Sequence, residues 1–298
     1  MKILVIKHGA LGDIILAFPA FAAIRAAHAH SQIALLTTAP FAAFMKASPW
    51  FDEVMVDSRP DPWDVPGLLR LRRQLRGFDL VYDLQTSSRS TRYYALAGKP
   101  RWSGIAPGCA FPQTDPRRDS MHTRERLADQ LRIAGIPALP EPDLSWLRRE
   151  TPKLRLPQHY AVLVPGASPH RPEKKWPEQK FGALAAQLPI PSAIVGSAAE
   201  APLGAVIKSF AHRAIDLTGG TDLLELAAVI SRAALAVGND TGPMHLAAAL
   251  GVPSVVLFSS ASDPALTAPR YPDGGWPGIV SAAHLSGVSV AQVVAALP

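Results

Sequence analysis

Short apolar runs alternate with longer stretches of helical periodicity along most of the chain. Such runs are typical of strands buried in a parallel sheet, and the longer stretches are typical of the helices that cover it. In the first half we expect strands at residues 2–6, 32–37, 53–56 and 79–84, and helices at 14–27, 41–47, 65–76 and 122–134. Pro19 predicts a kink in the first helix. The alternation indicates an α/β fold whose parallel sheet is covered on both faces.

A second alternation follows a proline-rich stretch at residues 136–157, which we interpret as an interdomain linker. Here the expected strands lie at 160–164, 192–195, 215–217, 235–237 and 252–258, and the expected helices at 181–188, 200–211, 223–231, 244–250 and 288–297. A polar loop is expected at 85–89, and an irregular segment at 98–121. We therefore predict two doubly wound domains, residues 1–150 and 151–298. The final helix could pack back on the first domain.

The loop Gly-Asn-Asp-Thr-Gly at residues 238–242 joins a buried strand to an alanine-rich helix. In open parallel sheets, ligands bind where the strands end. The backbone N–H groups of Thr241, Gly242 and Met244 are expected to lack helical partners and to lie at the positive end of the helix dipole, which favours an anion. His245 could donate to a phosphate oxygen. A Thr-capped helix with a core-facing histidine fits the pattern equally well, so both interpretations stay open.

Polar residues at other predicted strand ends add candidates. Asp13 follows the first strand at a helix start, where it is either an N-cap or a base that takes a proton from a hydroxyl. Ser168 and Lys174 belong to a basic loop that is either an anion site or solvated surface. Glu200 either accepts from a ribose or base, or only begins a helix.

Composition excludes several classes of protein and site. The apolar fraction is 48%, and the single cysteine, Cys109, excludes an intramolecular disulfide and fits a reducing compartment. The N-terminal apolar run is too short for a signal peptide, and no run reaches membrane-spanning length. We therefore expect a cytoplasmic protein, or one held on a membrane face. The sequence contains no Asp-x-Asp pair and no Cys/His cluster, so no metal site is expected. It also lacks the Walker loop and the G-x-G-x-x-G fingerprint of other nucleotide-binding proteins.

Positive charge is concentrated in the N-terminal half. Residues 1–157 hold 22 Lys and Arg against 15 Asp and Glu, a balance of +7, whereas residues 158–298 hold 8 against 9, a balance of −1. Nucleic acid, an anionic membrane surface or an acidic substrate would each suit this excess. A solvated, arginine-rich surface explains it as well.

Three motifs, taken together, resemble a known family. In chain order they are Gly12-Asp13 with Pro19 and Arg25, then Pro165-Gly166-Ala167-Ser168 with Lys174-Lys175-Trp176-Pro177, and then Asp240-Thr241-Gly242-Pro243-Met244-His245. This combination resembles the bacterial lipopolysaccharide heptosyltransferases, family nine of the glycosyltransferases. The resemblance spans nearly the whole chain, and its third motif is the most specific. Residues 98–121 match no part of the family pattern.

The resemblance implies a GT-B fold, in which two Rossmann-like domains face each other across a cleft. It implies an inverting, metal-independent transfer of heptose from ADP-heptose to a lipopolysaccharide core acceptor. The N-terminal domain would bind this anionic, lipid-linked acceptor, at the cytoplasmic surface of the inner membrane, and the C-terminal domain would bind the nucleotide-sugar. Neither a cofactor nor nucleic acid is expected as a ligand.

The resemblance also implies roles for individual residues. Asp13 would be the general base on the acceptor hydroxyl, Lys174 the cation on the donor phosphates, and Asp240 a neighbour of the donor sugar. The donor-side candidates are Ser168, Lys174, Glu200, Asp240, Thr241, Gly242 and His245. The acceptor-side candidates are Gly12, Arg70, Arg73, Arg89 and Arg92.

Three other functions remain open at this point. A transferase of the same family could modify a protein or use another nucleotide-sugar. A nucleotide-sugar epimerase would share the GT-B fold. A non-catalytic nucleotide-binding module would keep the site around Thr241 but would not need Asp13.

Overall fold

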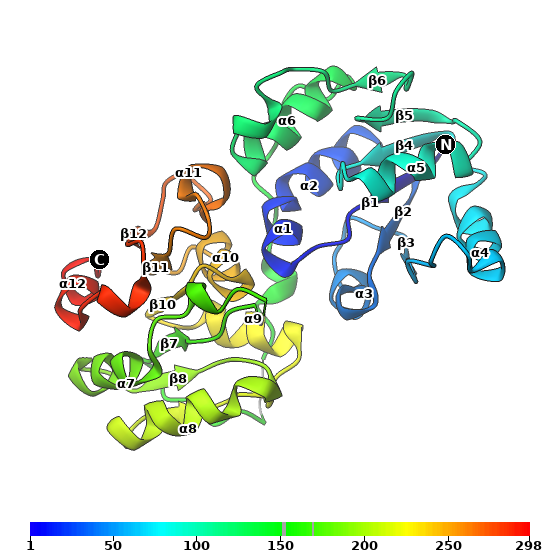
Figure 1. Ribbon diagram of the computed structural model, residues 1–298. Helices are drawn as coiled ribbons and strands as arrows, with labels where there is room; N and C mark the ends of the chain where they lie inside the picture. The colour runs from blue at the N-terminus through cyan, green and yellow to red at the C-terminus, as the bar shows by residue number, and fades with distance from the viewer. Residues whose placement is uncertain (151–152, 169) are drawn as a thin grey trace. The chain divides into compact units, whose positions relative to one another are not determined.

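The computed structural model describes residues 1–150, 153–168 and 170–298. The chain forms two compact units, Met1–Trp146 and Leu147–Pro298, and each is built around a six-stranded parallel sheet (Figure 1). The predicted α/β class with two doubly wound domains is therefore confirmed. The boundary between the units falls inside the proline-rich stretch that the sequence predicts as a linker. None of the described helices is long and apolar enough to cross a bilayer.

The sheet of the first unit has the strand order β3-β2-β1-β4-β5-β6. Its strands are β1 (Lys2–Ile6), β2 (Gln32–Thr37), β3 (Glu53–Val56), β4 (Leu80–Asp83), β5 (Arg101–Gly104) and β6 (Phe111–Pro112). In the register of the sheet, Val5 of β1 lies between Leu35 of β2 and Tyr82 of β4. All three side chains are buried because helices cover both faces of these central strands.

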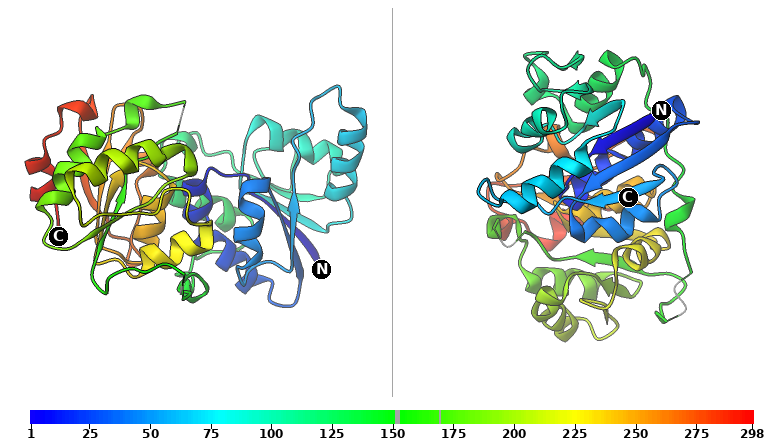
Figure 2. Two further views of the ribbon diagram at one scale, coloured as in Figure 1. Left: turned by 90° about the horizontal axis from the view of Figure 1, so that it is seen from below. Right: turned by 90° about the vertical axis from the view of Figure 1, so that its right-hand side faces the viewer.

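Seven helical elements surround this sheet. They are α1 (Leu11–Leu16), α2 (Phe18–Ala27), α3 (Ala39–Lys46), α4 (Val65–Leu75), α5 (Ser88–Leu96), α6 (Thr123–Ile133) and the 3-10 turn η1 (Arg118–Ser120). Helices α1, α2 and α6 contact one another, and α4 and α5 form a second contacting group. Figure 2 shows that helices cover both faces of the sheet. Leu71 and Leu75 of α4 join Leu4 and Ile6 of β1 in one buried apolar cluster.

The sheet of the second unit has the strand order β12-β11-β10-β7-β8-β9. Its strands are β7 (Ala161–Val164), β8 (Ser192–Ile194), β9 (Ile215–Asp216), β10 (Leu235–Asn239), β11 (Ser254–Phe258) and β12 (Gly278–Ser281). Its helices are α7 (Glu178–Gln187), α8 (Ala201–Phe210), α9 (Leu223–Ser231), α10 (Gly242–Ala249), α11 (Pro264–Thr267) and α12 (Val290–Ala295). The 3-10 turns are η2 (Ser145–Leu147), η3 (Pro172–Lys174), η4 (Ala198–Glu200) and η5 (Leu285–Gly287).

Helices α7, α8 and α12 pack over one part of this sheet, and α9 packs against α10. Val293 of α12 is fully buried in one apolar cluster with Phe181 and Leu184 of α7. The last helix, which we expected to be able to pack back on the first domain, therefore belongs to the core of the second unit.

The helix predicted at residues 14–27 is broken in the structure. Ala17 separates α1 from α2, and Pro19 lies in the first turn of α2, so the predicted kink is confirmed. Helix α1 begins earlier than predicted, with Ala10 at the N-cap position. Asp13 therefore lies inside the first turn of α1, and the interpretation of Asp13 as an N-cap is wrong.

Three segments contain regular structure that the sequence does not predict. The polar loop expected at 85–89 runs into α5, which starts with a capping box formed by Ser87 and Ser90. The segment 98–121, expected to be irregular, contains β5, β6 and η1, and Trp102 of β5 is fully buried. Beyond β11, α11 and β12 complete the sheet. Tertiary contacts rather than periodicity specify such short elements.

Both sheets share one topology. Counted from the first strand of each unit, the order is 3-2-1-4-5-6, which is that of the dinucleotide-binding Rossmann fold. The direction of winding reverses between β1 and β4 in the first unit, and between β7 and β10 in the second. Ligands bind outside the carboxyl ends of such central pairs. The topology therefore marks one candidate site in each unit.

Candidate functional site

The site of the second unit is held together by Asn239, the last residue of β10. Asn239 is fully buried, and its Nδ2 donates to the carbonyl of Pro165 just after β7 (2.8 Å). The N–H of Trp176 donates to Asn239 Oδ1 (3.0 Å), and the Trp176 indole donates to the carbonyl of Val288 (3.0 Å). Asn239 thus fixes both the end of β7 and the basic loop against β10. The sequence analysis does not single it out.

Gly238, one residue earlier, allows the close packing at this point. A Cβ at residue 238 would lie 2.5 Å from Cβ of Val164 and 2.8 Å from the sulfur of Met244. Only a glycine lets β7, β10 and the start of α10 approach so closely. The glycine before the Asn239-Asp240 dipeptide is therefore a packing requirement.

The N-terminus of α10 presents backbone donors at this edge of the sheet. The hydroxyl of Thr241, at the N-cap position, donates to the carbonyl of Asn239 (3.1 Å) and does not cap the helix. The N–H of Met244 donates to the carbonyl of Thr241 (3.0 Å), so our expectation that it is free is wrong. Within the described part of the chain, the N–H groups of Thr241 and Gly242 have no acceptor. They point to an anion site with two backbone donors.

Asp240, which follows β10, gathers three side chains. Lys174 Nζ lies 2.6 Å from Asp240 Oδ2, the hydroxyl of Ser262 donates to the same oxygen (2.7 Å), and His245 Nε2 lies 3.7 Å from Oδ1. Burial acts to raise the pKa of Asp240, but these neighbours outweigh it and lower the pKa to about 2. Asp240 is therefore ionised at neutral pH and forms a nearly buried ion pair with Lys174.

Two candidate side chains of this site, Lys174 and His245, are both shielded from solvent. The side chain of Lys174 is 12% exposed and that of His245 is 7% exposed. His245 Nδ1 has no hydrogen-bond partner among the described residues, which is uncommon for a buried polar atom. Lys174, expected to act on donor phosphates, is bound to Asp240 in this structure.

Glu200 and Ser168 lie at the neighbouring strand ends. Glu200 Oε2 accepts from the N–H of Ser197 (2.6 Å) in a capping box at η4, so its expected role at a helix start is observed. Its other oxygen, Oε1, lies directly against Gly166, where a Cβ would collide with it. The carboxylate therefore reaches across from β8 to the end of β7. Ser168 is exposed on the loop that follows β7.

A hollow of about 470 Å³ opens beside Asp240 at the ends of β11 and β12. It is lined by Ser259, Ser260, Ser262, Asp263, Pro264, Ser281, Ala282 and Ala283. Ser262 belongs both to this hollow and to the group around Asp240. The hollow therefore continues the anion site along the carboxyl edge of the sheet.

In the first unit, the candidate residues lie where β1 and β4 end. Lys7, directly after β1, is buried and donates from Nζ to the carbonyl of Leu84, directly after β4 (3.2 Å). Burial lowers the pKa of Lys7, and the negative charges of Asp13 and Asp83 oppose that shift. Asp13 is partly exposed beside the buried Gly12. Asp13 is thus a partly exposed carboxylate in a charged group that also contains the buried Lys7 and the buried Asp83.

Asp83, the last residue of β4, is the buried carboxylate of this group. Its Oδ1 accepts from the N–H groups of Gln85 (3.1 Å) and Thr86 (3.0 Å). Burial nevertheless raises the pKa of Asp83 to about 6. Asp83 therefore shapes the loop after β4 and is poorly placed to serve as an exposed base.

Two arginines that no sequence pattern singles out, Arg118 and Arg126, belong to the same charged group around Lys7. Burial lowers the pKa of Arg126 on α6, and the nearby charge of Arg118 acts in the same direction, whereas Asp119 and Asp13 oppose the shift. Arg118 donates to Gln113 Oε1 (3.0 Å) and to the hydroxyl of Thr86. Arg118 lies in η1, inside a segment for which no structure is expected, so the sequence carried no signal for this placement.

The four predicted acceptor-side arginines lie elsewhere on the unit. Arg70 and Arg73 are exposed on α4, whose C-terminal end leads into the start of β4, at the edge opposite Asp13. Arg89 lies in the first turn of α5 and donates to the carbonyl of Pro60 (3.3 Å), and Arg92 is exposed on the same helix. The structure therefore does not gather these residues around Asp13.

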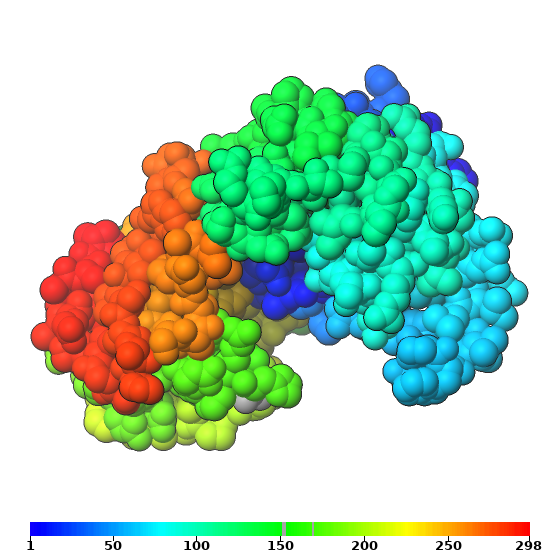
Figure 3. Space-filling view, turned by 45° about the horizontal axis from the view of Figure 1, so that its top comes forward, coloured from blue at the N-terminus to red at the C-terminus, as the bar shows by residue number. Residues whose placement is uncertain are grey.

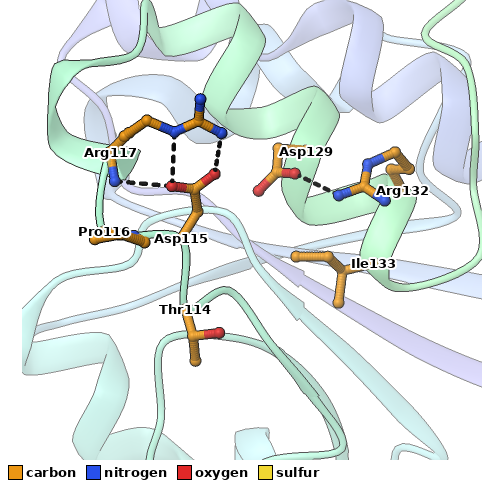
Figure 4. Close-up of a pocket in the computed structure, with 7 residues that line it drawn as sticks. All are labelled: Thr114, Asp115, Pro116, Arg117, Asp129, Arg132 and Ile133. Carbon is orange, nitrogen blue, oxygen red and sulfur yellow. Dashed lines mark hydrogen bonds and ion pairs between the residues drawn. The ribbon is translucent and has the colours of Figure 1, made fainter.

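A further hollow, of about 550 Å³, lies in the first unit next to α6 (Figure 4). It is lined by Thr114, Asp115, Pro116, Arg117, Asp129, Arg132 and Ile133. Asp115 accepts two bonds from the guanidinium of Arg117, at 3.2 and 3.0 Å, and Asp129 accepts from Arg132 at 2.8 Å. The charged side chains of the hollow are thus paired with one another.

Across residues 1–150, 153–168 and 170–298, no three His, Cys, Asp or Glu side chains are grouped so that they could hold a metal ion. Metal independence remains a prediction.

Comparison with known proteins identifies the family. Residues 68–273 match the model of glycosyltransferase family 9 (heptosyltransferase). The chain belongs to this family. The matched region contains every donor-side candidate and leaves Asp13 outside. The chain is also similar to lipooligosaccharide heptosyltransferase 2 of Haemophilus influenzae, with 34% identity over 108 residues, which cover 34% of this chain and 31% of that protein. The match thus spans about a third of that relative's length.

Solved structures share the fold over the whole chain. A family 9 glycosyltransferase from Veillonella parvula has a TM-score of 0.82 at 22% identity, covering 99% of this chain and 95% of that one. The E. coli heptosyltransferase WaaC with ADP has a TM-score of 0.78 at 20% identity, covering 99% and 98%. These likenesses establish a GT-B-like fold for this member of family 9.

Proposed function

We propose that this chain is an inverting, metal-independent glycosyltransferase that moves heptose from ADP-heptose to a lipopolysaccharide core acceptor. The observation that carries the proposal is the group at the end of β10. There Asp240 is paired with Lys174 at 2.6 Å, beside the N–H groups of Thr241 and Gly242, which have no acceptor among the described residues, in a chain of a heptosyltransferase family. The E. coli relative whose structure contains ADP supports an adenine nucleotide as the donor.

The donor side would act on the leaving group. As the bond between the anomeric carbon and the phosphate oxygen breaks, negative charge grows on the departing ADP. The N–H groups of Thr241 and Gly242 and the positive end of the α10 dipole would stabilise that charge without reorganising. Lys174 adds a cation nearby, and its ion pair with Asp240 holds it in place. Such fixed positive charge can replace a divalent metal.

The acceptor side would supply the base. An inverting transfer needs an acceptor hydroxyl in line behind the anomeric carbon and a group that takes its proton as the new C–O bond forms. Asp13 is partly exposed just after β1, whereas Asp83, the other carboxylate whose charge acts on Lys7, is fully buried. Arg118 and Arg126 would favour an acceptor with negative groups close to the reacting hydroxyl.

Donor selectivity in acceptor-dependent turnover tests this proposal. The purified chain is incubated with ADP-heptose, ADP-glucose or UDP-glucose, each with and without a heptose-free lipopolysaccharide core, and the released nucleoside diphosphate is measured. We expect acceptor-dependent release from ADP-heptose alone. Equal release of nucleoside diphosphate from all three donors, or release that does not depend on the acceptor, would contradict the proposal.

A matched pair of lysines tests the role of the donor site. Lys174→Ala should lower kcat/KM for ADP-heptose by about a hundredfold, because it removes a positioned cation from the leaving group. Lys175→Ala is the control, since Lys175 is exposed and forms no ion pair with a described residue. Equal effects of the two substitutions would remove Lys174 from the mechanism.

A further inference from the structure

Helix α4 and the turn before it form an exposed surface that the proposed reaction does not use. The side chain of Trp63 is 80% exposed, that of Val65 60% and that of Leu69 48%. Eight large apolar residues are exposed among those that the structure describes, and these three lie within seven residues of one another. We call residues 63–76 the α4 surface. In Figure 3 this segment lies in the projecting lobe drawn in cyan at the lower right.

The α4 surface is amphipathic along its length. Gly67, Leu71 and Leu75 follow one another at four-residue spacing and are buried against the sheet. Val65 and Leu69 lie one turn apart on the outer side, with Trp63 just before the helix. The outer side of the second half is basic, and its exposed arginines are Arg70, Arg72, Arg73 and Arg76. Apolar side chains and cations therefore share one outward face.

The positive charge of this face is not neutralised locally. None of its four arginines forms an ion pair with a described residue. The two carboxylates that flank the arginines in sequence have other hydrogen-bond partners: Asp64 accepts from the N–H of Gly67 (2.9 Å), and Asp79 accepts from the N–H of Lys2 (2.7 Å). The cations also lie toward the amino edge of the sheet, away from Asp13, so they are poorly placed to meet a reacting hydroxyl. Their charge is available to a large anionic surface.

We infer that the α4 surface docks on an anionic phospholipid membrane. Trp and Leu side chains beside a row of arginines are the features that hold a helix in the plane of a bilayer interface, with the rings at headgroup depth and the cations on acidic lipids. Three apolar side chains cover far less than the roughly 800 Å² per partner of a stable protein interface. They suffice for reversible membrane association when cations add to it. The inference does not rest on the proposed activity.

Vesicle co-sedimentation tests the inference directly. The full chain is mixed with vesicles of phosphatidylcholine, or of phosphatidylcholine with phosphatidylglycerol. We expect binding to the anionic vesicles and little to the neutral ones. Arg72→Gln with Arg76→Gln should weaken binding by about twenty-fivefold, since each arginine near the surface contributes about fivefold. Trp63→Ser with Leu69→Ser should weaken it by about tenfold or more.

Matched control variants distinguish membrane docking by the α4 surface from a general effect of positive charge and from a loss of folding. Lys208→Gln with Arg213→Gln removes two exposed cations from the second unit, and Val294→Ser removes an exposed apolar side chain from α12. Both controls should bind anionic vesicles as the parent does. Circular dichroism and thermal unfolding should be unchanged in every variant, because the substituted side chains are exposed. If the parent protein does not bind anionic vesicles, or if the control variants lose as much binding as the α4 variants, the inference is wrong.

A kinetic measurement distinguishes the membrane from a water-soluble ligand. With a deacylated, water-soluble acceptor, Arg72→Gln with Arg76→Gln should keep the parent kcat/KM, whereas transfer to the same acceptor embedded in anionic vesicles should fall. An equal fall with both acceptors would place these arginines in acceptor binding and would overturn the docking role.

Discussion

At the residue scale, the ionised state of Asp240 is the feature on which the donor site depends. A nearly buried carboxylate is normally disfavoured in its charged form. Here Lys174 and Ser262 both contact Oδ2, at 2.6 and 2.7 Å, and hold the charge in place. The same contacts fix Lys174, which would otherwise be a flexible surface cation. The ion pair thus holds one cation of the basic loop at a fixed position.

The pKa of Asp240 makes this pair visible in the pH dependence of stability. Its pKa falls from 3.8 to about 2 on folding, so the native state binds fewer protons than the unfolded state between these values. The stabilisation is present above pH 4 and is lost as the pH falls through about 2. The free energy of unfolding of the parent should therefore drop by about 2 kcal/mol more than that of Asp240→Asn across this window. Urea unfolding at several pH values measures it, and parallel curves for the two proteins would refute the assignment.

Asp13 is the residue on which the proposed acceptor side depends. Asp13→Asn keeps the shape of the first turn of α1 but cannot accept a proton. We expect kcat to fall by about a hundredfold or more, with the dissociation constant for ADP-heptose unchanged. Asp61→Asn, at an exposed position of the same unit, is the control and should keep the parent kcat. A near-normal kcat for Asp13→Asn would show that Asp13 is not the base.

At the element scale, the site depends on strand ends that approach one another closely. Glycines at 166 and 238 leave room for Glu200 and for α10, respectively. Gly166→Ala should displace the Glu200 carboxylate and raise the KM for ADP-heptose by about tenfold, the size expected for one lost hydrogen bond to a charged group. Glu200→Ala should have a similar effect, and the double variant should be no worse than either one.

Gly287→Ala is the control for this prediction. No atom lies within 4 Å of the Cβ that it would add, and the backbone there needs no left-handed conformation. It should leave the KM for ADP-heptose unchanged. If Gly166→Ala behaves like Gly287→Ala, Glu200 does not touch the donor.

The elements themselves differ in how well the sequence predicts them. Long apolar runs such as 2–6 and 254–258 carry a strong local signal, because both faces of those strands are buried. Helix α5 has a polar first turn closed by Ser87 and Ser90, and β5 is defined by a buried Trp102 within a Gly- and Pro-rich segment. Such elements depend on contacts with distant parts of the chain, which periodicity does not contain.

The family resemblance predicts residues for the donor site but not the contacts between them. It assigns Lys174 and Asp240 to the donor side, and nothing in the sequence shows that these residues, 66 positions apart, form an ion pair. The same holds for Arg118, whose placement near Arg126 depends on the unexpected η1 turn. Local sequence rules predict that the Thr241 side chain caps α10. In the structure the Thr241 hydroxyl donates to the carbonyl of Asn239 instead.

At the scale of the whole molecule, the two units divide the charge unevenly. The first unit, residues 1–146, holds 18 Lys and Arg against 14 Asp and Glu. Residues 147–157, which follow it, add 4 against 1. The basic excess of the N-terminal half therefore has two sources, and nearly half of it belongs to the proline-rich stretch. Within the first unit, the four arginines of the α4 surface equal the whole of its net charge.

The central claim is that the chain transfers heptose with inversion and without a metal. The most direct test incubates the purified protein with ADP-heptose and a heptose-free core acceptor in excess EDTA, then analyses the product by mass spectrometry and NMR. The account predicts one heptose added per ADP released, with the anomeric configuration opposite to that of the donor. Retention of configuration, ADP release without transfer, or a strict requirement for added Mg²⁺ or Mn²⁺ would contradict it.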